Sequence, residues 1–269
     1  MDILTHTLSG IAIGTTVISF SNNKFRNKLG IIGLAGFGSA LPDIDAISLW
    51  SKFDSTIGKF FGLENSGKEI YFSKFWYSHH GFLHSLFAGL LIAIIFSLLF
   101  YLIKTKLKGL SISGFTRNIG TQKYNLISFI SGLIIHLIED MPTPNSVWGG
   151  VNFFWPSKSY IGGTGDIWWW NNYDIFLIVV GVIVLNGIIL TINKAIRYDL
   201  RKLTAVVFIL GVTLSVFQIK SREFDFNYYG YTQKYQQFEL KSKEIQKQIL
   251  GKNLFNTMVK FDNKIPVNF

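Results

Sequence analysis

The sequence contains no cysteine among its 269 residues. A disulfide framework, a thiolate metal site and a cysteine nucleophile are therefore excluded. Any metal ion must be held by nitrogen and oxygen ligands, and histidine, the usual nitrogen ligand, occurs only five times. Charged residues make up only 16% of the chain, which is too few for an efficient soluble surface.

Several other sequence signals are missing. No Gly-x-Ser-x-Gly segment is present, so a serine hydrolase has little support. The glycine-rich segment 162–165 lacks the lysine of a phosphate-binding loop, and we interpret it as a turn. The first residues carry neither a basic stretch nor a small-residue cleavage site, so we do not expect a removable signal peptide.

Apolar side chains dominate what is present. They account for 49% of the residues, and the 25 Phe and 7 Trp suit lipid contact and an interfacial aromatic belt. Segments 82–103 and 175–192 are clearly long and apolar enough to span a bilayer. The full set of candidate spans is 8–20, 30–50, 82–103, 126–141, 175–192 and 203–219. These segments predict an all-α, polytopic membrane protein with about six membrane-embedded helices.

The basic residues predict how the chain lies in the membrane. The formal net charge is +10, but Lys and Arg fall mainly in short clusters between the apolar segments and in the C-terminal tail. The clusters at 24–28, 104–123 and 194–202 share one side of the membrane if all six segments span it. The positive-inside rule makes that side cytoplasmic and places both termini outside. We therefore expect a multi-pass protein of the cell membrane that contacts the lipid bilayer, with no nucleic acid as its primary partner.

The composition changes sharply after the last apolar segment. Residues 220–269 are rich in Lys, Gln, Tyr and Asn, with an amphipathic helix predicted around 233–250. We expect a helical membrane domain over 1–219 and a small extramembrane tail over 220–269. The helix of the tail either lies on anionic lipid through its basic face or packs against the outer loops.

Residues able to bind a metal ion interrupt the apolar pattern at four places, which include every histidine. They are His6; Asp43 and Asp45; His79, His80 and His84; and His136 and Asp140. In the topology predicted from Lys and Arg alone, all of them map to the outer face. His80 and His84, and likewise His136 and Asp140, are four residues apart and so share a helix face. Without thiolates, imidazole and carboxylate groups are the usual ligands of zinc and similar divalent ions.

Each of these places also has a purely structural explanation. His6 alone could be an ordinary polar residue near the N-terminus, and Asp43 after Pro42 could cap a helix or form a turn. His136 and Asp140 could be a buried, hydrogen-bonded pair. The joint pattern favours a metal site, because no histidine lies elsewhere and all four places converge on one face.

The same residues resemble the motifs of the YdjM-type family of predicted metal-dependent hydrolases of the inner membrane. The matching positions are Thr5-His6, Leu41 to Asp45, His79 to Ser85, His136, Asp140, Thr143, Gly149 and Trp155-Pro156. The resemblance covers about residues 1–190. Two positions depart from the family pattern: His80 stands where arginine is usual, and Leu83 stands where threonine is usual. The histidine at position 80 either adds a ligand or removes a phosphate-binding cation. The family is distantly similar to zinc-dependent phospholipases C, which implies phosphoester hydrolysis.

The residues and the resemblance together predict a membrane-bound hydrolase. It would cleave an ester or phosphoester in a lipid or lipid-linked substrate with a metal-activated water, using one or two divalent ions, zinc being the first choice. The expected metal ligands are His6, Asp45, His79, His84, His136 and Asp140. The expected catalytic residues are Asp43, Asp45 and His80, with Asp43 either as general base or as a group that orients a histidine.

Two other functions fit parts of the sequence. An ion or small-molecule transporter would need polar residues that continue through the membrane, whereas here they stop near one surface. A non-catalytic membrane scaffold would bind a partner through its basic loops. Measurement of bound metal separates the hydrolase from the scaffold.

Overall fold

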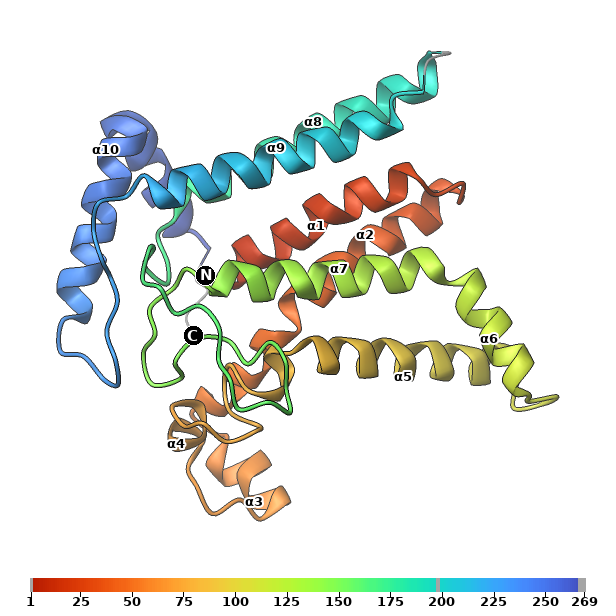
Figure 1. Cartoon of the computed structure of the whole chain (residues 1–269), viewed down its shortest axis with the longest axis horizontal. Helices are drawn as coiled ribbons and strands as arrows, with labels where there is room; N and C mark the ends of the chain where they lie inside the picture. Colours follow the sequence, from red (N-terminus) through yellow and green to blue (C-terminus); the bar gives the residue numbers. More distant parts are fainter. Residues whose placement is uncertain (1, 197–198, 266–269) are drawn as a thin grey trace.

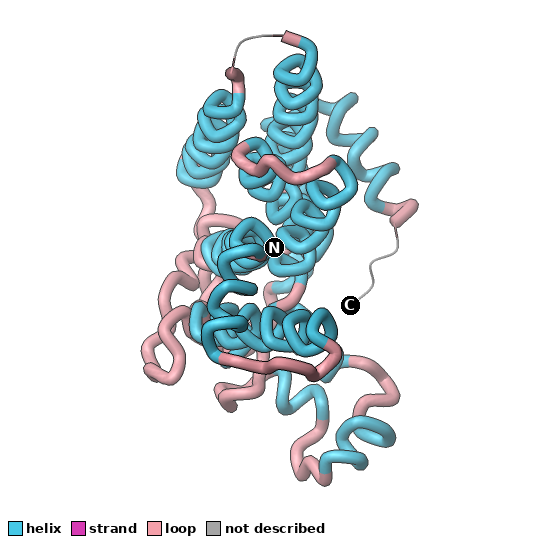
Figure 2. Tube along the Cα trace, turned by 90° about the vertical axis from the view of Figure 1, so that its right-hand side faces the viewer, coloured by secondary structure: helices cyan, strands magenta, loops and turns pink. Residues whose placement is uncertain are grey.

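The computed structural model of the protein describes residues 2–196 and 199–265. Within these ranges every regular element is a helix, and three isolated β-bridges lie in the loops (Figure 2). The all-α prediction is therefore confirmed for the described residues. The elements are α1 (Ile3–Ser19), α2 (Phe25–Ala40), η1 (Pro42–Leu49), η2 (Asp54–Gly58), α3 (Lys59–Phe61), α4 (Gly67–Tyr71), η3 (Phe82–His84), α5 (Leu86–Thr105), α6 (Ile112–Thr121), α7 (Lys123–Asp140), α8 (Tyr173–Ala195), α9 (Arg201–Lys220) and α10 (Tyr235–Asp262).

The long helices α1, α2, α5, α7, α8 and α9 run alongside one another and form the body of the molecule (Figure 1). At one end, on the left of Figure 1, lie α3, α4, α10 and the long loop between α7 and α8. At the opposite end α6 connects α5 to α7. The two ends of the helix bundle are therefore different, and the predicted site residues belong to the end with the loops.

Three helices, α5, α8 and α9, are long and apolar enough to cross a membrane, and α2 with η1 is a fourth candidate if this bent pair forms one span. The prediction of about six spans is therefore not confirmed. α1 is apolar but has only 17 residues, fewer than the roughly 20 that a bilayer requires. α7 begins with Lys123 and ends with Glu139 and Asp140, and such charges are costly in lipid.

The predicted continuous segment 30–50 is divided in the structure. α2 ends at Ala40, and η1 continues at an angle of 49° to it. Pro42 stands at the start of η1, where its missing N–H and its ring prevent α2 from continuing. The bend brings Asp43 close to α7. Oδ1 of Asp43 lies 3.8 Å from Nε2 of His136.

Small residues let α1, α2 and α7 pack closely. A Cβ atom on Gly10 of α1 or on Gly132 of α7 would overlap the backbone carbonyl of Ala35 in α2. Membrane helices commonly use small residues in this way, because close backbone approach increases van der Waals contact. Ser39 of α2 also donates a hydrogen bond to the carbonyl oxygen of His6 at 2.7 Å. These contacts fix the start of α1, the end of α2 and the end of α7 next to one another.

α8 and α9 attach to α1 through buried polar contacts. Asn186 of α8 donates to Thr15 Oγ1 at 2.9 Å, and Thr204 of α9 donates to Ser19 Oγ at 2.9 Å. Such hydrogen bonds satisfy polar side chains that would otherwise be costly among apolar residues. α8 and α9 are thereby held against the same helix that carries His6.

The tail after α9 forms α10, which is broken at Gly251, where φ is 73° and ψ is 161°. α10 extends beyond the predicted helix 233–250. The ring of Phe238 lies 5.3 Å from that of Trp168 in the loop before α8. α10 therefore packs against this loop. The division into domains at residue 219 stays a prediction.

Candidate metal centre

The first turn of α1 and the last turn of α7 bring two of the predicted residues together. Asp2 caps α1 by accepting a hydrogen bond from the backbone N–H of Thr5 at 2.9 Å, which fixes the turn that carries His6. Asp140 is the last residue of α7. Nε2 of His6 lies 3.1 Å from Oδ1 of Asp140, and both side chains are buried.

The histidines of the segment before α5 are held by local backbone structure. His80 has a φ of 62°, a conformation that costs a non-glycine residue about 1 to 3 kcal/mol and is found at functional sites. The backbone N–H of Asn152 donates to the His80 carbonyl at 3.1 Å, and His80 Nδ1 donates to the Gly150 carbonyl at 2.8 Å. Ser85 then caps α5 by accepting from Ala88 N at 3.1 Å, directly after His84.

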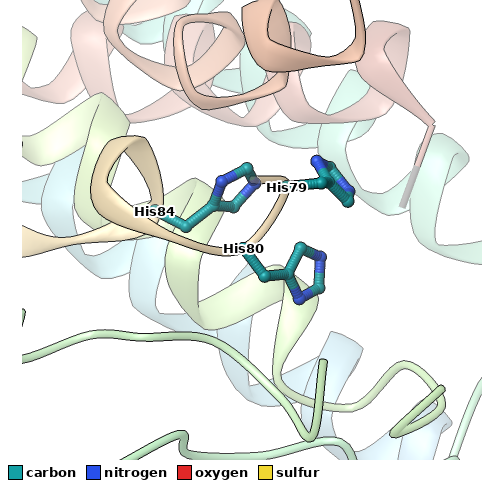
Figure 3. A group of neighbouring side chains, drawn as sticks. All are labelled: His79, His80 and His84. Atoms are coloured by element: carbon teal, nitrogen blue, oxygen red, sulfur yellow. The ribbon is translucent and has the colours of Figure 1, made fainter. Parts of the chain in front are cut away.

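Figure 3 shows the side chains of His79, His80 and His84 gathered beside this segment. The ring centroids of His79 and His80 are 4.4 Å apart, and that of His84 lies 4.8 Å from each of them. One nitrogen from each ring can be chosen so that all three lie within 4.8 Å of one another. The three imidazoles are therefore close enough to serve one ion.

The Asp140 carboxylate lies at the centre of the larger cluster. Its Oδ2 is 3.1 Å from Nε2 of His136, 3.7 Å from Nε2 of His84 and 4.0 Å from Nε2 of His80. Two ligands bound to zinc at about 2.1 Å are roughly 3.4 Å apart in a tetrahedral site. The separations around Asp140 are thus of the size expected between ligands that share an ion.

Asp43 extends the cluster on the side of η1. Its Oδ1 lies 3.8 Å from Nε2 of His84 and 3.8 Å from Nε2 of His136. Asp43, His84 and His136 form a second triad of candidate ligands, and His6, His136 and Asp140 form another. The two triads have His136 in common. Together their residues offer enough donors for one or two ions.

Four of the five imidazoles contact an oxygen atom through Nδ1, whereas Nδ1 of His136 makes no hydrogen bond among the described residues. Nδ1 of His6 lies 2.7 Å from Glu139 Oε2. Asp45 approaches two rings, with Oδ1 2.7 Å from Nδ1 of His79 and Oδ2 3.2 Å from Nδ1 of His84. A metal-binding histidine almost always has such a partner on its second nitrogen, which fixes the tautomer and orients the ring.

Burial makes the inward-facing nitrogens costly without a cation. His6, His84 and His136 are 0% exposed. Their Nε2 atoms face carboxylate oxygens of Asp140 and Asp43 at 3.1 to 3.8 Å, an arrangement that is costly in a buried place unless a positive charge lies among them. A divalent cation would satisfy these nitrogens together with the carboxylates, so the residues present fit a metal ion.

The electrostatics of the segment before α5 agree with this fit. Burial lowers the pKa of His80 well below its usual value, and the neighbouring imidazoles of His79 and His84 add to the effect. His80 is therefore neutral, as a metal ligand must be. Burial also lowers the pKa of His84, but the carboxylates of Asp45 and Asp43 outweigh it and raise this pKa to about 10. The carboxylates thus favour a positive charge at this place.

A cavity of about 830 Å³ reaches the cluster from the side of α10. Asp43, His79, His80 and Asp140 are among its lining residues. The indole ring of Trp148 stacks on His80 at 4.7 Å. The cavity therefore gives a small molecule or a lipid headgroup access to the cluster.

The far part of this cavity has a mixed lining. Apolar residues of α1, α8 and α10, such as Ile3, Phe176 and Phe261, alternate with charged residues of α10 such as Glu239 and Lys243. The cavity thus joins the polar cluster to a wall that is partly apolar and partly charged.

All the residues predicted from the sequence lie in this one cluster, namely His6, Asp43, Asp45, His79, His80, His84, His136 and Asp140. Their individual roles stay predictions. Asp45 contacts only Nδ1 atoms in the ion pairs that it makes, whereas Asp43 lies near Nε2 atoms. The sequence interpretation missed Glu139. Its one signal in the sequence is that it is an acidic residue in the last turn of an apolar helix.

A known protein family covers the larger part of the chain. The family model described as YdjM inner membrane protein matches residues 1–223. The match includes every residue of the cluster and ends before α10. No curated protein and no solved structure matches the chain.

Proposed function

The chain belongs to the YdjM inner membrane protein family, and we propose that it is a membrane-bound, metal-dependent hydrolase. The observation that carries the proposal is the convergence of four imidazole Nε2 atoms on the carboxylate of Asp140, at 3.1 to 4.0 Å. The cofactor is one or two divalent ions, zinc being the first choice, since imidazole and carboxylate are its common ligands in the absence of thiolate.

The donor atoms divide between the two oxygens of Asp140. Oδ1 faces His6, and Oδ2 faces His80, His84 and His136. His6, His136 and Asp140 would hold one ion. Asp43 and His84, whose Oδ1 and Nε2 atoms are 3.8 Å apart, would hold a second with Oδ2 of Asp140, and Nε2 of His80, 4.0 Å from the same oxygen, is a further donor. His79 adds a further imidazole beside His84.

The carboxylates that contact Nδ1 atoms have a positioning role in this proposal. Glu139 orients His6, and Asp45 orients both His79 and His84. These contacts favour an orienting role for Asp45 over the ligand role expected from the sequence. They also leave Asp43, which lines the cavity, as the carboxylate that reaches both ligands and substrate.

The proposed reaction is hydrolysis of an ester or phosphoester. A bound zinc ion supplies a Lewis acid and lowers the pKa of water towards 7. Asp43, whose Oδ1 faces the imidazoles, would accept the proton of the attacking water at its other oxygen, as a general base within the cavity. Water adds across the scissile bond, which gives an alcohol and a carboxylic or phosphoric acid. His80, which is neutral and lines the cavity, contacts the reacting group.

The cavity supports a lipid or lipid-linked substrate. One part holds the cluster, and the far part offers apolar side chains such as Ile3, Leu4 and Phe176 among charged residues of α10. α8 is a candidate membrane span. A substrate with a hydrocarbon chain can therefore place its polar linkage at the cluster while the chain contacts apolar side chains.

The distribution of charge favours a hydrolase over an ion transporter. In α5, α8 and α9, acidic and basic side chains occur only in the first or last turns. Transporters usually carry ionisable residues within their spans, where they form the path. The cluster instead occupies one end of the helix bundle.

Metal analysis of the purified chain tests the proposal. We expect the zinc-loaded protein to retain one or two ions after dialysis, and His136→Ala and Asp140→Asn to lose at least one of them. Asp199→Asn is the matched control, because Asp199 is exposed and pairs only with Arg201 in the ion pairs of the described chain. Unchanged metal content in both site variants would falsify the proposal. Hydrolysis of phospholipid, lipid-linked phosphate and carboxylic ester panels by the loaded protein then identifies the substrate class.

A further inference from the structure

A second, smaller cavity lies among the helices, away from the candidate metal centre. It has a volume of about 310 Å³ and is lined by α1, α7, α8 and α9. Its walls are aliphatic side chains such as Ile135, Ile138, Val179, Val182 and Val212. Hereafter we refer to this cavity as the groove.

The shape and surroundings of the groove indicate a hydrocarbon occupant. Phe208 and Lys220 of α9 both line it, and twelve residues of α-helix correspond to about 18 Å. The groove is therefore long and narrow. Because α8 and α9 are candidate membrane spans, it lies at the depth of lipid chains, where water does not fill an apolar space.

One end of the groove carries a pair of opposite charges. Lys220 Nζ donates to Asp166 Oδ2 at 2.8 Å, and both residues line the groove. A lysine ammonium has three donors, so two remain beyond the bond to Asp166. The Lys220 side chain is 62% exposed and that of Asp166 is 24% exposed. Both groups can therefore contact a headgroup next to the groove.

The groove is separate from the candidate metal centre. Glu139 lines the groove, whereas its neighbour Asp140 lines the larger cavity. The His6 ring lies between them, with Nδ1 2.7 Å from Glu139 and Nε2 3.1 Å from Asp140. A molecule in the groove would therefore lie on the Nδ1 side of the His6 ring, next to Glu139, and away from the Nε2 atoms of the cluster.

From these observations we infer that the groove binds one zwitterionic phospholipid. One acyl chain lies between α7 and α9, the phosphate contacts Lys220, and the headgroup ammonium contacts Asp166. Charge-assisted hydrogen bonds of this kind are stronger than neutral ones. The adjacent Asp166 and Lys220 favour a zwitterionic headgroup over an anionic one. An anionic headgroup would place negative charge next to Asp166. The inference does not depend on the proposed hydrolase activity.

Native mass spectrometry of the full chain, released from detergent with phosphatidylethanolamine or phosphatidylglycerol added, tests the inference. We expect one tightly held phosphatidylethanolamine in the wild type. Val179→Trp fills the groove and should reduce the lipid-bound fraction at least tenfold. Val184→Trp is the matched control, because Val184 lies on the same helix and is 54% exposed, so the wild-type level is expected.

A second pair of variants guards against misfolding of Val179→Trp. Ser215→Phe places an aromatic ring in the groove, and Thr213→Phe places the same ring on the exposed face of α9. Only the first should release the lipid. Equal retention by Ser215→Phe and Thr213→Phe would overturn the assignment of the groove. Equal binding of phosphatidylglycerol by the wild type, or an unchanged lipid preference in Asp166→Asn, would overturn the assignment of the headgroup.

Discussion

The Nε2 atom of His6, in the first turns of α1, lies 3.1 Å from Oδ1 of Asp140, the last residue of α7. The Nδ1 atom of the same ring lies 2.7 Å from Oε2 of Glu139. One imidazole therefore has a carboxylate at each nitrogen, and both carboxylates come from one helical turn. The arrangement is compatible with a histidine that binds a cation through one nitrogen and is oriented through the other, as the proposed function requires.

The first prediction concerns Glu139. Glu139→Gln keeps the size of the side chain but removes the charge that orients His6, so we expect zinc affinity to fall about 10- to 100-fold with the number of bound ions unchanged. Competition with a chromophoric chelator measures the affinity. Glu244→Gln is the control, because Glu244 is exposed and pairs with Lys241. An affinity equal to that of the wild type in Glu139→Gln contradicts the orienting role.

The second prediction separates the two aspartates of η1. Asp43 lies near Nε2 atoms and Asp45 near Nδ1 atoms. We therefore expect Asp43→Ala to bind one ion fewer at saturating zinc. Asp45→Ala should bind the full number with weaker affinity, because two histidines lose their orienting partner. Elemental analysis with equilibrium dialysis gives both quantities. The reverse result would restore Asp45 as a ligand, as the sequence suggested.

The contrast between these two aspartates marks how far sequence reasoning reaches. The chain has only five histidines and few acidic residues, so each ionisable group in an apolar segment stands out, and the cluster could be predicted. Which imidazole nitrogen faces inward depends on side-chain rotation and on contacts such as that of His80 with the Gly150 carbonyl. No periodicity or spacing encodes that choice.

The number of spans was harder to predict, for a related reason. The hydropathy of a segment does not reveal whether its neighbours shield it. α7 carries Glu139 and Asp140. Its Gly132 packs against Ala35 of α2, which also meets Gly10 of α1. The environment of α7 is set by these contacts between distant parts of the chain. Composition therefore predicted α5, α8 and α9 well but could not settle α1 and α7.

The third prediction tests this packing. Gly10→Ala places a methyl group against the Ala35 carbonyl, and overpacking of this kind typically costs about 1 to 3 kcal/mol. We expect a lower unfolding midpoint in detergent. Gly33→Ala is the control on the neighbouring helix, since a Cβ there meets nothing within 4 Å and should leave the midpoint nearly unchanged. Equal midpoints for the two variants would argue against close contact between α1 and α2.

The fourth prediction concerns the attachment of α10. Arg222 donates to both carboxylate oxygens of Asp174 at 2.8 and 2.9 Å, and Gln246 of α10 donates to the same carboxylate at 2.8 Å. Both charged side chains are buried. Loss of one partner of a buried ion pair costs about 3 to 5 kcal/mol, because the other charge remains buried.

We therefore expect Arg222→Ala to loosen α10 and to speed proteolysis within 223–234. Limited digestion with chymotrypsin, which cuts after aromatic residues such as Phe226 and Tyr229 in this segment, followed by mass spectrometry measures the rate. Arg201→Ala removes an exposed pair with Asp199 and should digest at the wild-type rate, since exposed pairs contribute little. A wild-type digestion rate in Arg222→Ala would show that other contacts hold α10.

The last prediction concerns the membrane itself. α5 begins after His84 and Ser85, beside the cluster, and its 20 residues extend about 30 Å, the thickness of the hydrocarbon core. Lys106 follows its far end, whereas Ser157 lies in the loop near Asn152, whose N–H bonds the His80 carbonyl. Topology reporters fused at Lys106 and at Ser157 should therefore give opposite signals. The basic residues around Lys106 predict that this side is cytoplasmic, so we expect the cluster on the other side. Matching signals from the two fusions would mean that the chain does not cross the membrane between Lys106 and Ser157, the segment that contains α7, and would contradict opposite sides for the two ends of α5.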